Sequence, residues 1–240
     1  MKKKVGILFI SIAILATGTL SAQKLNKVLK NHFKMVGQEN LVKVNSIIMK
    51  GSVYTQGMEF PLTLVLKRPA SVRTEVDVQG QLMVTAYDGK NGWTINPMMG
   101  WSEPQDLEPA QVKEMKIMGD IDGELYDYKK KGSSLELLGT ESIDDTECFK
   151  LKLTREEGDS SIFYMDSESY FIIKTETEMD VQGVKTLVEQ YPGNYKIIDD
   201  IAFPFSINQS YAGQTYMEIT MDSVELNPEI ADSLFIKPSQ

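Results

Sequence analysis

The sequence predicts a mainly β fold: a single open, strongly curved antiparallel half-barrel of about ten or eleven strands, covered by short helices. Apolar and polar residues alternate with a period of two over most of the chain after Val42. Glycines mark turns between these runs roughly every 10 to 15 residues, with no long helical segment between them. Only a few short stretches show the three- and four-residue apolar spacing of a helix.

The first helical pattern covers residues 25–36. Leu25, Val28 and Leu29 fall on one face, and lysines occupy most of the remainder. Gly37 is the expected end of this helix. The simplest interpretation is a helix packed on a sheet with its lysines in solvent. The alternative is a basic face that touches a membrane surface.

The strand pattern is clearest in residues 62–67, where every second residue is leucine, and in residues 72–78. It continues through residues 82–87 and 93–96, on either side of a turn at 88–92. Alternation of this kind favours antiparallel strands with one apolar and one polar face. Residues 134–226 return to the same pattern, and strands close in sequence are expected to pair. The last stretch, 227–238, is a turn and a short apolar end that we expect to dock on the barrel rim.

Prolines are expected to interrupt the sheet in the middle of the chain. Pro97 and Pro104 should break extended structure, whereas Pro109 suits the first turn of a helix. Apolar residues at helical spacing then predict a short amphipathic helix that ends at Gly119. Residues 124–131 are compatible with a further short helix.

The N-terminus has the pattern of a secretory signal peptide. Lys2, Lys3 and Lys4 precede an apolar run of about 12 residues and a small residue, so we expect residues 1–22 to be removed after Ala22. The remaining domain would cover residues 23–240 and lie in the periplasm. Loss of the three lysines changes the formal charge from −9 to −12, which argues against nucleic acid as a partner.

Side chains suited to catalysis are sparse. The only cysteine, Cys148, lies in a strand pattern and far from residue 22, so we expect neither a disulfide nor a lipid anchor. The only histidine, His32, has no nucleophile at a fixed spacing. Residues 120–131 resemble a calcium loop, but Lys131 stands where the EF-hand needs glutamate. We therefore expect no enzyme activity, metal or cofactor.

The apolar faces predict a cavity. Two short helices are too small to fill the concave side of so wide a curved sheet, so an apolar space should remain. Such a space suits an acyl chain, because about 0.8 kcal/mol is gained per methylene removed from water. Methionine is flexible enough to line it. The residues that we expect to line it are Leu62, Leu64, Leu66, Val76, Trp93, Ile95, Met98, Met99, Trp101, Val112, Met115, Met118, Leu151, Leu153, Met217, Ile219 and Met221.

One set of motifs is similar to a known family. Residues 67–69 (Lys-Arg-Pro), 87–90 (Tyr-Asp-Gly-Lys), Trp93 and 96–97 (Asn-Pro) resemble the R-P and D-G-K-x-x-W-x-x-N-P motifs of LolA, the periplasmic carrier of outer-membrane lipoproteins. Weaker similarity to the wider lipoprotein-sorting group extends over most of the mature chain, at residues 164–166, 172–174, 201–204 and 235–238. The resemblance implies an open antiparallel barrel with a helical lid.

The resemblance also implies a role for Arg68. In the family, the arginine of the R-P motif bonds from the sheet to the lid backbone and keeps the empty carrier closed until acyl chains displace it. Arginine has five donors in a rigid fork, which suits this role. The alternative is an arginine at a strand end that extends into water. The Met- and Trp-containing run 98–101 and the length of the chain depart from the LolA pattern.

These observations favour a soluble, monomeric periplasmic carrier of acylated cargo. The cargo would be a lipoprotein or another lipid, received from an inner-membrane donor and passed to an outer-membrane acceptor. The alternative is an envelope sensing or interaction domain on the same scaffold, which binds a regulatory protein partner.

Overall fold

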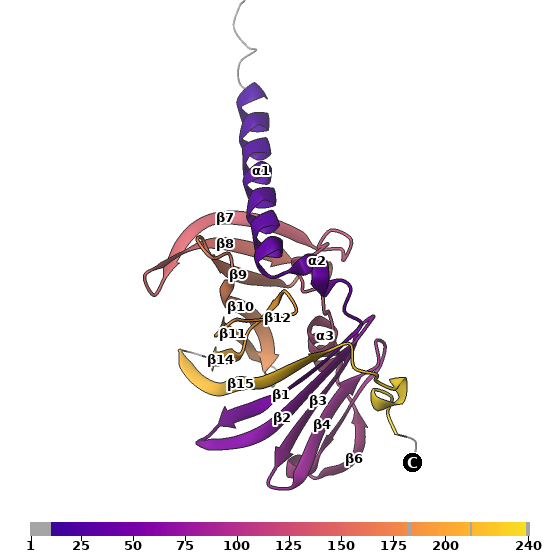
Figure 1. Cartoon of the computed structure of the whole chain (residues 1–240). Helices are drawn as coiled ribbons and strands as arrows, with labels where there is room; N and C mark the ends of the chain where they lie inside the picture. Colours follow the sequence, from indigo (N-terminus) through magenta and orange to yellow (C-terminus); the bar gives the residue numbers. More distant parts are fainter. Residues whose placement is uncertain (1–10, 182–183, 212, 239–240) are drawn as a thin grey trace, which may run out of the picture.

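A computed structural model describes residues 11–181, 184–211 and 213–238. Its main element is an antiparallel sheet that follows the order β6-β5-β4-β3-β2-β1-β15-β14-β11-β10-β9-β8-β7 and does not close. Figure 1 shows this sheet curving around α3 and β12. The strands are β1 (Ser46–Thr55), β2 (Met58–Lys67), β3 (Ser71–Val78), β4 (Gln81–Tyr87), β5 (Gly92–Asn96), β6 (Trp101–Asp106), β7 (Ser134–Ile143), β8 (Thr146–Thr154), β9 (Ser160–Asp166), β10 (Ile172–Val181), β11 (Val184–Gly193), β14 (Ser206–Tyr211) and β15 (Gln214–Leu226). The predicted open, curved antiparallel fold is confirmed, with 13 strands in the described part of this sheet.

Three α-helices occur in the described residues: α1 (Ser11–Met35), α2 (Gln38–Leu41) and α3 (Pro109–Met118). α1 begins upstream of the predicted start at Leu25, and it ends just before Gly37, whose φ of 72° is left-handed. Residues 1–10 of the predicted signal peptide lie outside the described residues. Within the described part, no helix has both the length and the apolar character needed to span a bilayer.

The middle of the chain differs from the prediction in two places. Residues 101–106 form β6, although Pro104 was expected to break extended structure there. β6 is an edge strand, and an edge strand tolerates a residue that donates no backbone hydrogen bond. Residues 124–131 form consecutive turns rather than a helix.

One face of the sheet carries an apolar surface from strand to strand. Leu66 pairs with Ile47 on one side and with Val72 on the other, and Val72 pairs with Tyr87. All four side chains are buried on the same face. Every second residue of each of these strands points to the same face, because side chains alternate between the two faces of a strand.

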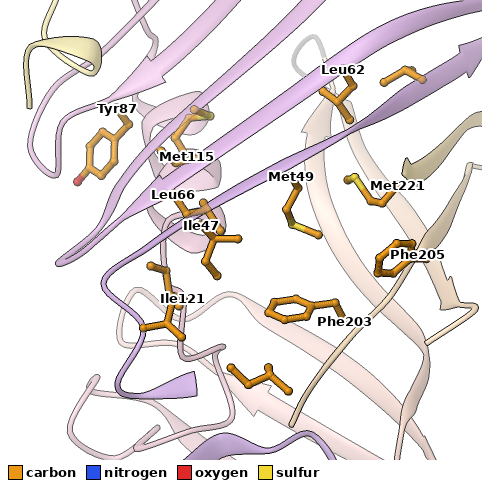
Figure 2. Packing of buried hydrophobic residues seen from close by; sticks show 14 of the residues in the cluster. Ile47, Met49, Leu62, Leu66, Tyr87, Met115, Ile121, Phe203, Phe205 and Met221 are labelled. Atoms are coloured by element: carbon orange, nitrogen blue, oxygen red, sulfur yellow. The ribbon is translucent and has the colours of Figure 1, made fainter. Parts of the chain in front are cut away.

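Three segments cover the concave face. Met115 of α3 and Ile121 in the following loop pack against the strands, and the hairpin formed by β12 (Lys196–Ile198) and β13 (Ile201–Phe203) supplies Phe203. Phe205 follows directly after the hairpin. Figure 2 shows these side chains directed toward Ile47, Met49, Leu62, Leu66 and Met221 of the sheet. The concave face is therefore closed by packing in this conformation.

A second apolar cluster lies at the other end of the sheet. The C-terminal half of α1 places Leu25, Val28 and Leu29 against β7, β8 and β9, where Leu151 and Leu153 are fully buried. The alternative of a membrane contact for α1 therefore cannot involve this apolar face, because the sheet already covers it.

The C-terminal segment crosses the outer, convex face instead of the rim. Trp93 Nε1 donates to the carbonyl oxygen of Phe235 at 2.8 Å, and Arg73 donates to that of Leu234 at 3.0 Å. Lys237 forms an ion pair with Asp106 of β6 at 2.8 Å. Residues 232–237 thus connect several strands near the β6 edge.

Candidate functional site

The structure brings together most of the residues predicted to line a cavity. Eleven of them share the concave face or point toward it from α3. Those that are buried are Leu62, Leu66, Met115, Leu151, Leu153 and Met221, and those that are half-buried and packed against the same surface are Leu64, Val76, Val112, Met217 and Ile219. Nine of them belong to the cluster under α3, whereas Leu151 and Leu153 belong to the second cluster, under α1.

Trp93 and Ile95 do not belong to this surface. Gly92 pairs with Tyr87, whose side chain is on the concave face, so Trp93 falls on the opposite face. There Trp93 packs with Val84 and Ala86, and its exposed fraction is 2%. The prediction therefore grouped residues from two faces, because the turn between β4 and β5 sets which residue of β5 faces inward.

Met98, Met99, Trp101 and Met118 lie at the rim. Met98 and Met99 belong to the 3-10 turn η1 (Pro97–Met99) and are 62% and 61% exposed, while Met118 is the last residue of α3 and is 45% exposed. None of these side chains lines the packed interior in this conformation. The prediction that they line the cavity is therefore not matched in this conformation.

Three apolar side chains of the interior were not expected from the sequence. Ile121, Phe203 and Phe205 occupy the space in which a cavity was expected. The alternation of Ile201, Phe203 and Phe205 was visible, but it indicated only a strand. Nothing in the local pattern shows that this strand belongs to a separate hairpin that folds into the concave side.

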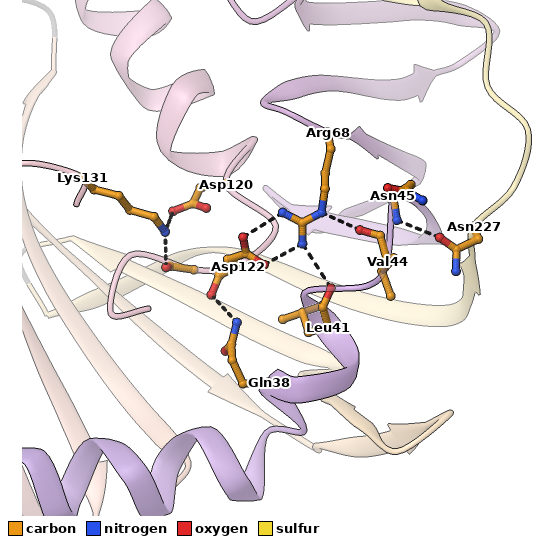
Figure 3. A network of polar contacts seen from close by, with 10 residues as sticks. Gln38, Leu41, Val44, Asn45, Arg68, Asp120, Asp122, Lys131 and Asn227 are labelled. Atoms are coloured by element: carbon orange, nitrogen blue, oxygen red, sulfur yellow. Dashed lines mark hydrogen bonds and ion pairs between the residues drawn. The ribbon is translucent and has the colours of Figure 1, made fainter. Parts of the chain in front are cut away.

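Arg68 lies where the end of β2 meets the loop after α3. Its backbone joins Pro69 through a cis peptide bond. Its guanidinium donates to the carbonyl oxygens of Val44 (2.6 Å) and Leu41 (3.1 Å) and to both carboxylate oxygens of Asp122 (2.7 and 2.6 Å). Figure 3 shows Arg68 between these three groups. One side chain thus connects the sheet, the end of α2 and the segment that follows the lid.

Neighbouring polar groups reinforce this connection. Gln38 of α2 donates to the backbone oxygen of Asp122 at 3.1 Å, and Lys131 bonds Asp120 at 2.6 Å (Figure 3). The hydrogen bonds that Arg68 donates to Asp122 raise the pKa of Arg68 above its ordinary value, ahead of the opposing effect of burial. Asp120 and Asp122 are the residues whose pattern resembled a calcium loop. The pattern reflects a turn whose carboxylates bind cationic side chains.

Gly119 fixes the end of α3 against the same region. A Cβ atom at this position would lie 2.4 Å from the backbone oxygen of Ala70. This distance is too short for any side chain. The lid helix therefore ends in direct contact with the backbone that follows Arg68 and Pro69.

The described residues offer little to hold a metal. No group of three or more His, Cys, Asp or Glu side chains within them is placed to bind an ion. His32 is buried between α1 and the sheet, where its Nδ1 lies 2.8 Å from the backbone oxygen of Tyr170. Burial lowers the pKa of His32, although this contact opposes the shift.

No family model matches the sequence, and no curated protein is similar to it. Several solved structures are similar to it. A DUF1329 family protein from Desulfovibrio piger has a TM-score of 0.59 at 12% identity, over 87% of this chain and 97% of its own. An outer membrane lipoprotein-sorting protein domain from Vibrio parahaemolyticus has a TM-score of 0.57 at 12% identity, over 83% and 94%. A LolA superfamily protein from Nitrosomonas europaea has a TM-score of 0.56 at 14% identity, over 81% and 90%.

These similarities define the class of fold. The chain has a LolA-like fold, in agreement with the resemblance of its R-P and D-G-K motifs. At identities of 12% to 14%, the similarity concerns the fold alone.

Proposed function

We propose that this protein is a carrier that buries acyl chains of a lipid or lipoprotein between the concave face of its sheet and α3. The observation that supports this most directly is the composition of that face. From β4 to β15 it is apolar, and there it is covered by α3, the loop after it and a hairpin instead of by further layers of the fold. Burial of each methylene group of a chain would contribute about 0.8 kcal/mol.

Binding requires α3 and its loop to move. Met115 and Ile121 occupy the concave side, so an incoming acyl chain must replace their contacts with the sheet. The polar groups that hold the lid remain close to solvent, because the side chains of Arg68 and Asp122 are 24% and 19% exposed. Their bonds can therefore be exchanged for bonds to water without leaving charges buried.

The proposal includes release of the lid by exchange of contacts, with no covalent step and no cofactor. The acyl chain would make apolar contacts with the sheet that are similar to those the lid makes in the empty protein. The free energies of the empty and loaded states would then be close, so binding would be reversible, as a carrier needs. Met118, the last residue of α3, is an exposed apolar group of the lid itself. It provides a flexible apolar contact where the lid would open.

We further propose that the carrier works in the periplasm after removal of residues 1–22. Support comes from the basic and then apolar pattern of this segment. The mass and N-terminal sequence of the protein isolated from an envelope fraction test this location. An intact Met1 in the isolated protein would contradict it.

Native mass spectrometry of protein purified from the envelope is the primary test of lipid carriage. A second test measures binding of a fluorescent fatty acid to two matched variants on β2. Leu64 faces the concave side, while its neighbour Thr63 faces the opposite side and serves as the control. Both side chains are half-buried. We expect Leu64→Gln to weaken binding of a fluorescent fatty acid by about tenfold, since an amide would enter an apolar site, and Thr63→Gln to leave it unchanged.

Two results would contradict lipid carriage. One is a protein that is free of lipid when isolated and that binds neither fatty acid nor acylated peptide. The other is an equal effect of the two β2 variants. Co-purification of a stoichiometric protein partner without lipid would favour the alternative of an interaction domain.

A further inference from the structure

The lid helix is attached to both ends of the open sheet. Its apolar side contacts β3, β4 and β5, which lie next to the β6 edge. Lys113, from the middle of α3, forms an ion pair with Asp159 at 2.5 Å. Asp159 is in the turn between β8 and β9, next to the β7 edge. α3 therefore spans the opening between the two ends of the sheet.

Asp159 belongs to a compact charged cluster. Arg155 donates to Asp159 at 2.7 Å, to Glu124 at 2.7 Å and to the hydroxyl of Ser161 at 2.8 Å, and only 9% of its side chain is exposed. Ser161 in turn contacts Thr177 on β10 at 2.7 Å. Arg155 thus holds Asp159 in position from the sheet, and Glu124 connects the cluster to the segment after the lid.

One carboxylate oxygen of Asp159 has its cationic partner on the lid helix. Arg155 bonds Oδ2, while Oδ1 is shielded from solvent and makes no hydrogen bond of regular geometry within the described residues. The ammonium of Lys113 faces Oδ1. Loss of this ammonium with the lid closed would leave a carboxylate oxygen buried without its cation, which is costly. With the lid open, the same oxygen would be reached by water.

The pKa shifts of the two carboxylates in the cluster are consistent with a role of Lys113 at Asp159. Burial by itself would raise the pKa of Asp159, but Lys113 and Arg155 outweigh burial and hold the pKa below its ordinary value. For Glu124, burial is the larger effect and raises the pKa, although Arg155 opposes it. The closed lid thus supplies one of the two cations that favour the ionised form of Asp159.

We propose that Lys113 and Asp159 are positioning residues that hold α3 across the opening of the sheet, as a second latch opposite the contacts of Arg68. This inference rests on the proposed function, in which α3 must move to admit an acyl chain. The two latches differ in place and in kind. Arg68 fixes the loop after α3 through a two-bond ion pair with Asp122 and through backbone carbonyls, whereas Lys113 fixes the helix itself to the far end of the sheet through a single ion pair.

The test compares two lysines of the same helix. Lys113→Met removes the ammonium and keeps the length of the side chain. Lys116→Met is the control, because Lys116 and Glu157 are 3.9 Å apart with both side chains more than half exposed, and such pairs contribute little. The readouts are hydrogen–deuterium exchange of the amides in α3 and the rate at which dansyl-undecanoic acid enters the protein.

We expect Lys113→Met to speed amide exchange in α3 by about tenfold and to speed uptake of the fatty acid. Lys116→Met should change both rates by less than about twofold. Salt at about 0.5 M should speed exchange in the unmodified protein and have little effect in Lys113→Met, because the ion pair is already absent there. Asp159→Asn combined with Lys113→Met should add little to the single substitution at Lys113, as expected for two residues that act as a pair.

Unchanged exchange of α3 in a folded Lys113→Met variant would overturn the inference. So would an equal response to Lys116→Met. The exchange measurement needs no lipid, which separates this inference from the proposed function. If exchange responds as expected but no variant takes up fatty acid, the second latch is supported and lipid carriage is rejected.

Discussion

Two parallel hydrogen bonds join Arg68 to Asp122: Nη1 donates to Oδ2 at 2.7 Å and Nη2 to Oδ1 at 2.6 Å. The two residues are 54 positions apart and come from opposite sides of the lid helix in sequence. A paired arrangement of this kind fixes both distance and orientation, which a single charge contact does not. It therefore locates the loop after α3 relative to the end of β2.

Substitution of Arg68 should loosen this loop. In Arg68→Leu, the carboxylate of Asp122 and the carbonyl oxygen of Val44 lose the guanidinium donor, and that of Leu41 keeps only the N–H of Val44. The free energy of unfolding should therefore fall by about 2 kcal/mol. Urea denaturation measures this change. Amide exchange in residues 120–123 and uptake of a fluorescent fatty acid should both become faster.

Arg68→Lys is the matched comparison for this prediction. Lysine keeps the charge but lacks the planar fork, so it can satisfy one partner and not all three. We expect its amide exchange to lie closer to that of Arg68→Leu than to that of the unmodified protein. Identical uptake by all three proteins would remove Arg68 from the mechanism.

Gly119→Ala should displace the end of the lid by steric contact alone. The new Cβ would meet the backbone oxygen of Ala70 at 2.4 Å, and backbone atoms cannot rotate away as a side chain can. We expect faster fatty-acid uptake and a lower melting temperature. Ala110→Gly in the first turn of the same helix is the control for helix stability: it costs up to about 1 kcal/mol by propensity without this contact. Equal uptake by the two variants would show that the Gly119 contact does not hold the lid.

The strands and the two faces of each strand could be predicted from the sequence, because alternation is a local property. Leu62, Leu64 and Leu66 are on one face wherever β2 lies in the sheet. The sequence did not predict which face of one strand lies on the same side of the sheet as a given face of the next strand. Trp93 was placed with the leucines, but pairing of Gly92 with Tyr87 puts it on the other face. Only the conformation of the turn at residues 88–91 determines this, and one residue of shift would reverse it.

The position of Arg68 at the lid was anticipated only through the resemblance to the LolA family. Its partners were not. Asp122 looked like part of a calcium-type turn, and its contact with Arg68 depends on the fold bringing residues 54 positions apart together. The Lys113–Asp159 pair is likewise a long-range contact, between a helix and a distant turn. Residues that are distant in sequence and belong to no common periodic pattern cannot be paired from one sequence alone.

Trp93 allows the two faces of the sheet to be tested separately. Its side chain is almost fully buried beneath residues 234–235, and Arg73 lies 5.4 Å from its ring. Trp93→Ala should therefore reduce the free energy of unfolding by about 3 to 5 kcal/mol. At a temperature where the variant remains folded, fatty-acid binding should be unchanged, because Trp93 is on the convex face. Weakened binding by the folded variant would mean that the lipid site includes this face.

The stability of the protein should depend on pH through His32, the only histidine in the chain. Burial lowers its pKa in the folded protein below the ordinary value of 6.5. As the pH falls through about 6.5, the unfolded chain therefore binds a proton before the folded protein does, and the free energy of unfolding decreases. The decrease can reach at most about 1.4 kcal/mol per pH unit and should level off below the pKa of the folded state.

Urea denaturation between about pH 7 and pH 5 measures this slope, in a window above the usual titration of the carboxylates. His32→Asn is the matched variant, because its side-chain amide can still donate to the backbone oxygen of Tyr170, the partner of Nδ1. We expect this variant to lose the part of the slope that His32 contributes and to keep any part from carboxylates with a raised pKa, such as Glu124. A slope of equal size in both proteins would assign the pH dependence to other groups and would show that His32 titrates normally.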